Sequence, residues 1–278
     1  MNEILRVENL NKTFHKNGLF HKNSNVVKAV KNVNFLLGLG EILAIAGQSG
    51  SGKSTIAKLI LRSIEPDSGK IYFEGKEILN DSDNLKKFRG QCQMVYQDPY
   101  DSMNPRMKVF DIVNEPLEIH NIGNKEERHK IVLETLKQVK LEPAEEIIGK
   151  FPHMLSGGQR QRVSIARALV TNPKVIIADE PVSMLDVSVR GEILELMSSI
   201  QKKKNISFIY ITHDLATAKY FADKIIILYA GEIMESGQTR DILTNPKHPY
   251  TKALIDAISI PDPKNLYKEK TIGWQIDT

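Results

Sequence analysis

The sequence contains very little cysteine: Cys92 is the only one in 278 residues. One cysteine cannot form a disulfide within the chain, and it cannot build a cysteine-ligated metal or iron–sulfur site. We therefore expect a reducing compartment, such as the cytoplasm, and we interpret Cys92 as a small residue of the core.

The sequence also lacks a large excess of charge of one sign and lacks long apolar runs. Lysine plus arginine number 38 against 34 aspartate plus glutamate, a net charge of +4, which does not indicate nucleic-acid binding without a clustered basic patch. The densest basic run, residues 201–205, is interpreted as the end of a helix, where lysines suit the negative end of the dipole. Apolar runs stay far below the roughly 18 residues of a membrane span, and the first ten residues lack the pattern of a signal peptide. We expect a chain that neither crosses a membrane nor is exported, but that can dock on one.

Strand patterns of two kinds are present. Residues 4–10 and 29–37 alternate apolar and polar side chains, and residues 68–78 do so around Gly75, as half-buried antiparallel strands do. Other segments are apolar without alternation, which is typical of strands covered on both faces; they are EILAIAG, CQMVYQDP, KVIIADEP and ISFIYITHD.

The stretch between these strands, from about residue 98 to 167, has a helical pattern; for example, Val132, Leu136 and Val139 follow each other at helical spacing. The order of elements predicts an α/β fold with a parallel, doubly wound sheet, an antiparallel β subdomain and an inserted helical subdomain. Ligands of such sheets lie beyond the carboxyl ends of the strands.

A glycine-rich segment, GQSGSGKS at residues 47–54, lies between a buried strand and a helix. It fits the pattern of a phosphate-binding loop, in which backbone amides surround the phosphate oxygens. We expect Lys53 to contact the β and γ phosphates and the Ser54 hydroxyl to bind Mg2+. The predicted nucleotide-binding residues of the segment are Gly47, Ser49, Gly50, Ser51, Gly52, Lys53, Ser54 and Thr55.

Two carboxylates end another buried strand, at Asp179 and Glu180. An unpaired charge there is costly, and Mg2+ beside Asp179 offsets that cost. Glu180, one residue on, can polarise a water for attack on the γ phosphate. Acidic pairs at strand ends also cap helices, but Pro181 follows here and the next helix is predicted to start later.

Gln97 and His213 each follow an apolar strand. Both side chains are therefore expected at the sheet edge that carries Lys53 and Asp179. The amide of Gln97 can bind Mg2+ or orient water, and the imidazole of His213 can donate to the γ phosphate.

A second glycine turn, LSGGQ at residues 155–159, opens a predicted helix. Ser156 can cap this helix, and Gly157 and Gly158 leave its first amides open to an anion. One chain thus carries two candidate phosphate receptors.

With these motifs in this order, the sequence resembles the ATP-binding subunits of ABC transporters up to about residue 260. The motifs are Walker A at 47–55, the Q-loop Gln97, the signature at 155–159, Walker B at 175–180, the D-loop at 183–186 and the switch His213. The resemblance implies a P-loop NTPase (RecA-like) core, hydrolysis of ATP with Mg2+, catalytic roles for Glu180, His213 and Gln97, and metal binding by Ser54, Gln97 and Asp179. It also implies one ATPase domain over residues 1–260, with its helical subdomain at about 98–167, and a tail at 261–278.

In the same family, two cassettes pair head to tail, so that Walker A of one and the signature of the other enclose one ATP. The resemblance therefore implies that the nucleotide is also contacted by the signature and D-loop residues Ser156, Gly157, Gly158, Gln159 and Asp186. It further implies that Phe14 stacks on adenine, although Phe20 is close enough to compete.

Residues 97–107 and 245–263 are similar to the oligopeptide, dipeptide and nickel importer subfamily. This implies a heterodimer with a sister ATPase, two membrane permeases, an extracytoplasmic binding protein, and a peripheral position on the cytoplasmic face of the cell membrane. The cargo would be peptides or a chelated metal such as nickel. Met154 and Met184 depart from the usual residues of this subfamily at the expected seam between cassettes.

Two other functions share much of this pattern. An ABC-type ATPase acting on nucleic acid or ribosomes would carry long coiled coils or two cassettes, and the chain shows neither, so no nucleic-acid partner is expected. An exporter ATPase would use the same chemistry, and only the subfamily resemblance argues against it.

Overall fold

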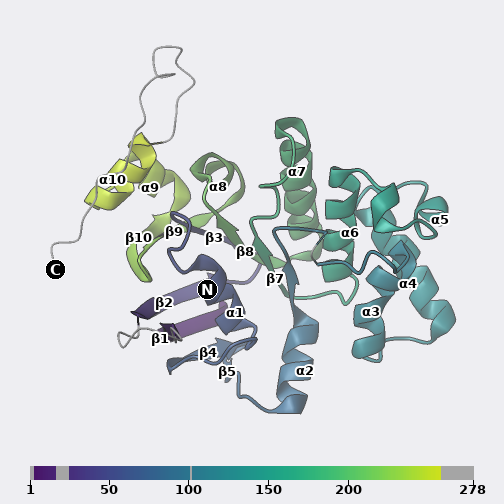
Figure 1. Ribbon diagram of the computed structural model, residues 1–278, viewed down its shortest axis with the longest axis horizontal. Helices are drawn as coiled ribbons and strands as arrows, with labels where there is room; N and C mark the ends of the chain where they lie inside the picture. Colours follow the sequence, from purple (N-terminus) through teal and green to yellow (C-terminus); the bar gives the residue numbers. More distant parts are fainter. Residues whose placement is uncertain (1–2, 17–24, 101, 258–278) are drawn as a thin grey trace.

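Two β-sheets and a group of helices build the molecule (Figure 1). The computed structural model describes residues 3–16, 25–100 and 102–257. Phe20 and the predicted tail at 261–278 lie outside the described residues.

The larger sheet has six strands in the order β10-β9-β3-β8-β7-β6. All neighbours are parallel except β10, which pairs antiparallel with β9. The strands are β3 (Ile42–Ala46), β6 (Cys92–Val95), β7 (Val175–Asp179), β8 (Ser207–Thr212), β9 (Lys224–Tyr229) and β10 (Glu232–Gln238). Every residue of β3, β7 and β8 is buried, which explains their unbroken apolar sequences. The predicted parallel sheet is confirmed.

The smaller sheet is antiparallel, with the order β2-β1-β4-β5. Its strands are β1 (Glu3–Lys16), β2 (Asn25–Gly38), β4 (Ser68–Phe73) and β5 (Lys76–Glu77). Buried side chains of this sheet, such as Leu5 and Ile71, share one core with Ile45 of the larger sheet and Ile56 of the helix after it. The residues that flank the loop between Ile45 and Ile56 therefore pack into a core that both sheets share.

Helices connect and cover the strands. Helices α1 (Lys53–Ile60), α2 (Ser82–Gln91), α7 (Val187–Lys204) and α8 (Leu215–Phe221) join strands, and α9 (Thr239–Thr244) and α10 (Pro249–Asp256) follow the last strand. Between β6 and β7 lie α3 (Val109–Ile119), α4 (Lys125–Gln138), α5 (Ala144–Ile147), a short 3-10 helix (Pro152–Met154) and α6 (Gly157–Leu169). These helices form the right side of the view in Figure 1. The boundary at 98–167 stays a prediction.

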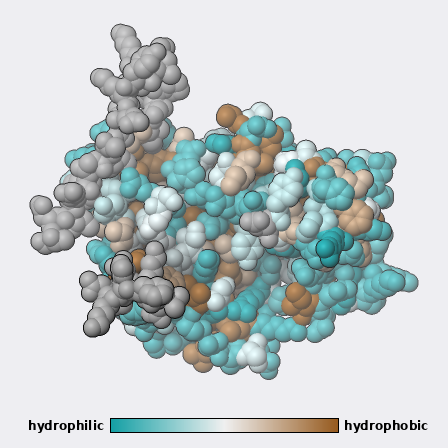
Figure 2. Space-filling view, in the orientation of Figure 1, coloured by the Kyte–Doolittle hydropathy of each residue, from teal (hydrophilic) through white to brown (hydrophobic). Residues whose placement is uncertain are grey.

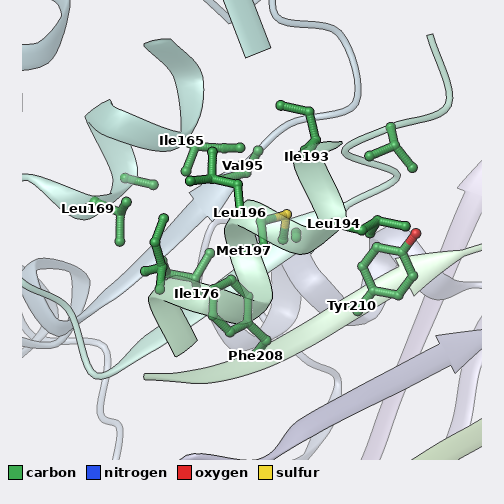
Figure 3. Close-up of a cluster of buried hydrophobic side chains, with 14 of the residues drawn as sticks. Val95, Ile165, Leu169, Ile176, Ile193, Leu194, Leu196, Met197, Phe208 and Tyr210 are labelled. Carbon is green, nitrogen blue, oxygen red and sulfur yellow. The ribbon is translucent and has the colours of Figure 1, made fainter. Parts of the chain in front are cut away.

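A buried cluster joins the larger sheet to α6 and α7 (Figure 3). Ile176 and Phe208 of the sheet lie near Ile165 of α6 and Met197 of α7 in this cluster. Each such side chain contributes about 1.5–3 kcal/mol when fully buried. The part of α6 that follows the signature is thus packed against the larger sheet.

Other sequence predictions concern single residues. Cys92 is buried, as expected, and α7 ends at Lys204 with Asn205 in the left-handed conformation.

On the face in Figure 2, hydrophobic residues are scattered in small groups among hydrophilic ones. Within the part of the chain that the structure describes, no helix is long and apolar enough to span a membrane.

Candidate functional site

The phosphate loop runs from β3 to α1. Lys53, the first residue of α1, is 5% exposed. Its Nζ donates to the carbonyl oxygens of Gly47 at 2.7 Å and Gln48 at 2.8 Å. Burial lowers the pKa of Lys53, while the carboxylates of Glu180 and Asp179 act in the opposite direction. The ammonium group is therefore held inside the loop, close to two acidic side chains.

Two glycines allow other backbone segments to approach this loop. A Cβ on Gly47 would lie 2.1 Å from the carbonyl oxygen of Leu228. A Cβ on Gly52, where φ is +108°, would lie 2.2 Å from the carbonyl oxygen of Ala29. No side chain fits either position, because a backbone carbonyl cannot move aside as a flexible side chain does.

We expect Gly52→Ala to lower the melting temperature and to weaken nucleotide binding, since it combines a strained φ with a backbone clash. Gly75→Ala is the matched control, because Gly75 also has a positive φ (+75°) but nothing within 4 Å of an added Cβ. Thermal unfolding of both variants tests this. Equal losses in the two variants would contradict the role assigned to close packing at Gly52.

Asp179 ends β7 and is buried. Its buried Oδ1 has no hydrogen-bond partner, and Ser54 lines the same cavity. Burial raises the pKa of Asp179, and the Ser54 side chain opposes that shift. A buried carboxylate oxygen without a donor, beside a hydroxyl, suits a divalent cation.

Glu180 follows directly, with a left-handed backbone (φ +45°) and its N–H donating to the Ile211 carbonyl at 2.9 Å. Two side chains hold its carboxylate. Gln97 Nε2 donates to Oε2 at 3.2 Å, and His213 Nδ1 lies 3.0 Å from Oε1. Uncommon backbone conformations of this kind cluster at functional sites. In this conformation, the Glu180 carboxylate lies between Gln97 and His213.

One pocket of about 680 Å³ is lined by the phosphate loop together with Gln97, Glu180 and His213. Its lining residues are Ala29, Gly47, Gln48, Ser49, Gly50, Gly52, Lys53, Ser54, Thr55, Gln97, Glu180, His213 and Leu254. The structure thus brings together residues from four separate sequence motifs, as expected where parallel strands end at one edge. Sequence reasoning missed Ala29, Gln48 and Leu254 as lining residues.

Three predicted residues lie beside the pocket rather than on its wall. Asp179 lines a neighbouring cavity together with Ser54 and Gln97. Ser51 is buried, and its hydroxyl has no hydrogen-bond partner. Phe14 is 40% exposed on β1 and pairs with Val27, two residues before the lining residue Ala29.

The signature segment lies at the start of α6, and none of its described residues lines the pocket. Ser156 Oγ accepts the Gln159 N–H at 3.2 Å, and Gln159 Oε1 accepts the Ser156 N–H at 3.0 Å. The predicted cap is confirmed. Gly157 and Gly158 follow it, and a Cβ on Gly158 would lie 2.8 Å from Val189 Cγ1 of α7.

Asp186 precedes α7 and makes no side-chain capping bond to it. The neighbouring Met184 is exposed, as is Met154 before the signature. Arg190 holds the D-loop by donating to the carbonyl oxygens of Leu185 and Ser183. The D-loop backbone is therefore ordered, while Met184 remains open to contact.

Comparison with known proteins agrees with this geometry. Residues 30–183 match the family described as "ABC transporter", and residues 234–276 match "Oligopeptide/dipeptide transporter, C-terminal region". The oligopeptide transport ATP-binding protein AppF of Bacillus subtilis is 41% identical over 97% of this chain and 82% of its own length. The dipeptide transport ATP-binding protein DppF of Haemophilus influenzae is 44% identical over 92% of this chain and 77% of its own length.

A solved structure is also similar: the ATP-binding cassette MJ0796, in a dimeric post-hydrolysis state bound to ADP and phosphate. It has a TM-score of 0.74 and 34% identity, and the match covers 85% of this chain and 99% of that one. The predicted P-loop NTPase fold is confirmed. The chain belongs to the ABC transporter family, as one of its ATP-hydrolysing subunits.

Proposed function

We propose that this chain is the ATPase subunit of a peptide importer. The observation that carries the proposal is the match of residues 234–276 to the oligopeptide/dipeptide transporter C-terminal region. The relatives described above are named for oligopeptide and dipeptide transport, which favours peptides over nickel as cargo.

In the proposed mechanism, the polyphosphate of ATP lies in the pocket, surrounded by the amides of the phosphate loop. Lys53 already donates to two loop carbonyls and has a third proton for a phosphate oxygen. Glu180 takes a proton from the attacking water, and Gln97 and His213 keep its carboxylate in place. Phe14, beside β2, is proposed to stack on adenine.

Mg2+ fits the residues next to this pocket. The unpaired Oδ1 of Asp179, the Ser54 hydroxyl and the Gln97 amide are oxygen-bearing groups of the kind that Mg2+ binds. When bound, Mg2+ neutralises charge on the phosphates. Ser54 and Asp179 already line the same cavity, so they require little rearrangement to hold it.

We expect Asp179→Asn to abolish the effect of Mg2+ on ATP affinity, because the amide has no negative charge to offer. Calorimetric titration of ATP with Mg2+ and with EDTA measures this directly. Asp83→Asn, on exposed α2, serves as the control. An Mg2+ effect of normal size in Asp179→Asn would contradict the assigned ligand.

The separation of the signature from the pocket supports a two-chain site. Ser156 to Gln159 do not line the pocket of their own chain. In a head-to-tail pair, they would instead face the nucleotide of the partner. The similar cassette MJ0796 is dimeric with ADP and phosphate. We propose a sister ATPase as the partner, with two permeases and an extracytoplasmic binding protein, on the cytoplasmic face of the membrane.

Uptake in cells tests the proposal. Deleting the gene should abolish uptake of a radiolabelled tripeptide, and the wild-type gene should restore it, whereas a Glu180→Gln gene should not. Nickel uptake measured in the same strains serves as the comparison. Loss of nickel uptake with normal peptide uptake would overturn the proposed cargo.

A further inference from the structure

The C-terminal helix α10 reaches the nucleotide pocket, where Leu254 is one of the lining residues. We propose that α10 is a working part of the nucleotide site: Leu254 forms a wall of the phosphate-binding space, and Tyr250 is a positioning residue for the phosphate loop. The inference rests on ATP binding in this pocket, and it goes beyond the proposed function by assigning a role to the C-terminal region.

Tyr250 is fully buried (0% exposed). Burial raises the pKa of its hydroxyl, and the backbone of Gln48, in the loop, acts in the opposite direction. The Gln48 backbone is therefore within electrostatic reach of the hydroxyl, which has no hydrogen-bond partner. A small movement of the loop on ATP binding would pair the hydroxyl with the Gln48 backbone and relieve the cost of burying it unpaired.

A second contact reaches the same loop through the end of β9 and the turn that follows it. The Tyr250 ring lies 4.4 Å from the ring of Tyr229, measured between centroids. Tyr229 follows Leu228, whose carbonyl oxygen sits against Gly47. Further along the turn, the Gly231 N–H donates to the Ser51 carbonyl at 2.9 Å. Tyr250 thus packs against the end of β9, and the end of β9 and the following turn contact the phosphate loop.

The start of α10 is anchored independently of Tyr250's hydroxyl. Glu235 of β10 accepts the N–H of Lys247 at 2.8 Å and of His248 at 3.1 Å. His248 Nδ1 then accepts the Tyr250 N–H at 3.1 Å and caps the helix, with Pro249 at its first position. Loss of the Tyr250 hydroxyl alone should therefore leave α10 in place.

Leu254 is tested by opposite charges at one position. Leu254→Glu and Leu254→Lys disturb the packing of an 8% exposed residue to a similar degree. The two variants differ mainly in the sign of the charge that they place near the polyphosphate. ATP should therefore bind at least about fivefold more weakly to the Glu variant than to the Lys variant. This difference in ATP affinity between the two variants should become smaller at high salt. Calorimetric titration of the full-length chain with ATP gives both values.

Ile255 provides the matched control, because it follows Leu254 in α10, is half-buried and is not among the pocket-lining residues. Ile255→Glu and Ile255→Lys should bind ATP equally. Equal affinities for the two Leu254 variants would overturn the proposed wall. If the charged variants do not fold, Leu254→Ala should weaken ATP binding more than Ile255→Ala, and equal binding by those two would overturn it as well.

Tyr250 is tested by Tyr250→Phe, which removes only the hydroxyl. In the assembled transporter, we expect the KM for ATP to rise about threefold with kcat unchanged, as a lost bond worth about 0.7 kcal/mol in the bound state requires. Tyr210→Phe is the control, since Tyr210 is also buried and its hydroxyl donates to Thr217 at 3.0 Å.

A lower melting temperature with unchanged KM in Tyr250→Phe would overturn the positioning role. Failure of the wild-type chain to bind ATP would instead overturn the proposed function. The two failures are therefore distinguishable in the same set of measurements.

Discussion

Glu180→Gln is expected to reduce ATP hydrolysis at least about 100-fold while leaving ATP binding intact, because an amide cannot accept the proton of the attacking water. The substitution preserves shape, and the amide can still contact Gln97 and His213, which hold the carboxylate at 3.2 and 3.0 Å. The left-handed backbone of Glu180 is also unaffected. The loss should therefore appear in kcat, with little change in ATP affinity.

The measurement is phosphate release by the assembled transporter, with ATP affinity determined by titration on the same preparation. Glu145→Gln controls for the loss of a carboxylate, since Glu145 pairs with Lys137 at an exposed site. Hydrolysis at the normal rate in Glu180→Gln would show that another group takes the proton.

Lys53→Met is expected to weaken ATP binding by about 10- to 100-fold, the range for losing hydrogen bonds to charged groups. Methionine keeps most of the aliphatic stem but removes the ammonium group. The Gly47 and Gln48 carbonyls also lose their donor, so the loop itself should become less ordered. Both effects act on binding, whereas Glu180→Gln acts on the chemical step.

Titration with ATP measures this loss, and thermal unfolding shows whether the fold is retained. Lys76→Ala, at an exposed position of β5, removes a positive charge far from the phosphate loop in sequence. ATP affinity close to that of the wild type in Lys53→Met would contradict the role of the ammonium group.

Much of the pocket could be predicted because parallel strands end at one edge of their sheet. Lys53, Gln97, Glu180 and His213 follow four different strands, and the structure places all four around one pocket. Gln97 lies two residues beyond the end of β6 at Val95, so the strand itself stops short of the pocket. The apolar strand pattern still indicates the position of Gln97, because the chain continues past the strand toward the same edge of the sheet.

The remaining part of the site depends on contacts between distant segments. Leu254 lies about 200 residues after the phosphate loop, and no local pattern indicates that α10 packs beside it. The hydrogen bonds of Lys53 to loop carbonyls likewise depend on how the loop closes. The roles of Phe14 and Asp186 stay predictions, because neither lines the pocket of this chain.

The cap of α6 limits which substitutions an active subunit tolerates. Ser156 Oγ accepts the Gln159 N–H, so its own proton remains available to an incoming anion. Aspartate caps helices about as well as serine, yet it has no proton to offer at neutral pH and would repel a phosphate. Selection for folding alone would accept either residue at this position. A lineage in which aspartate replaced this serine would keep a stable fold while losing the contact to phosphate that is proposed for Ser156.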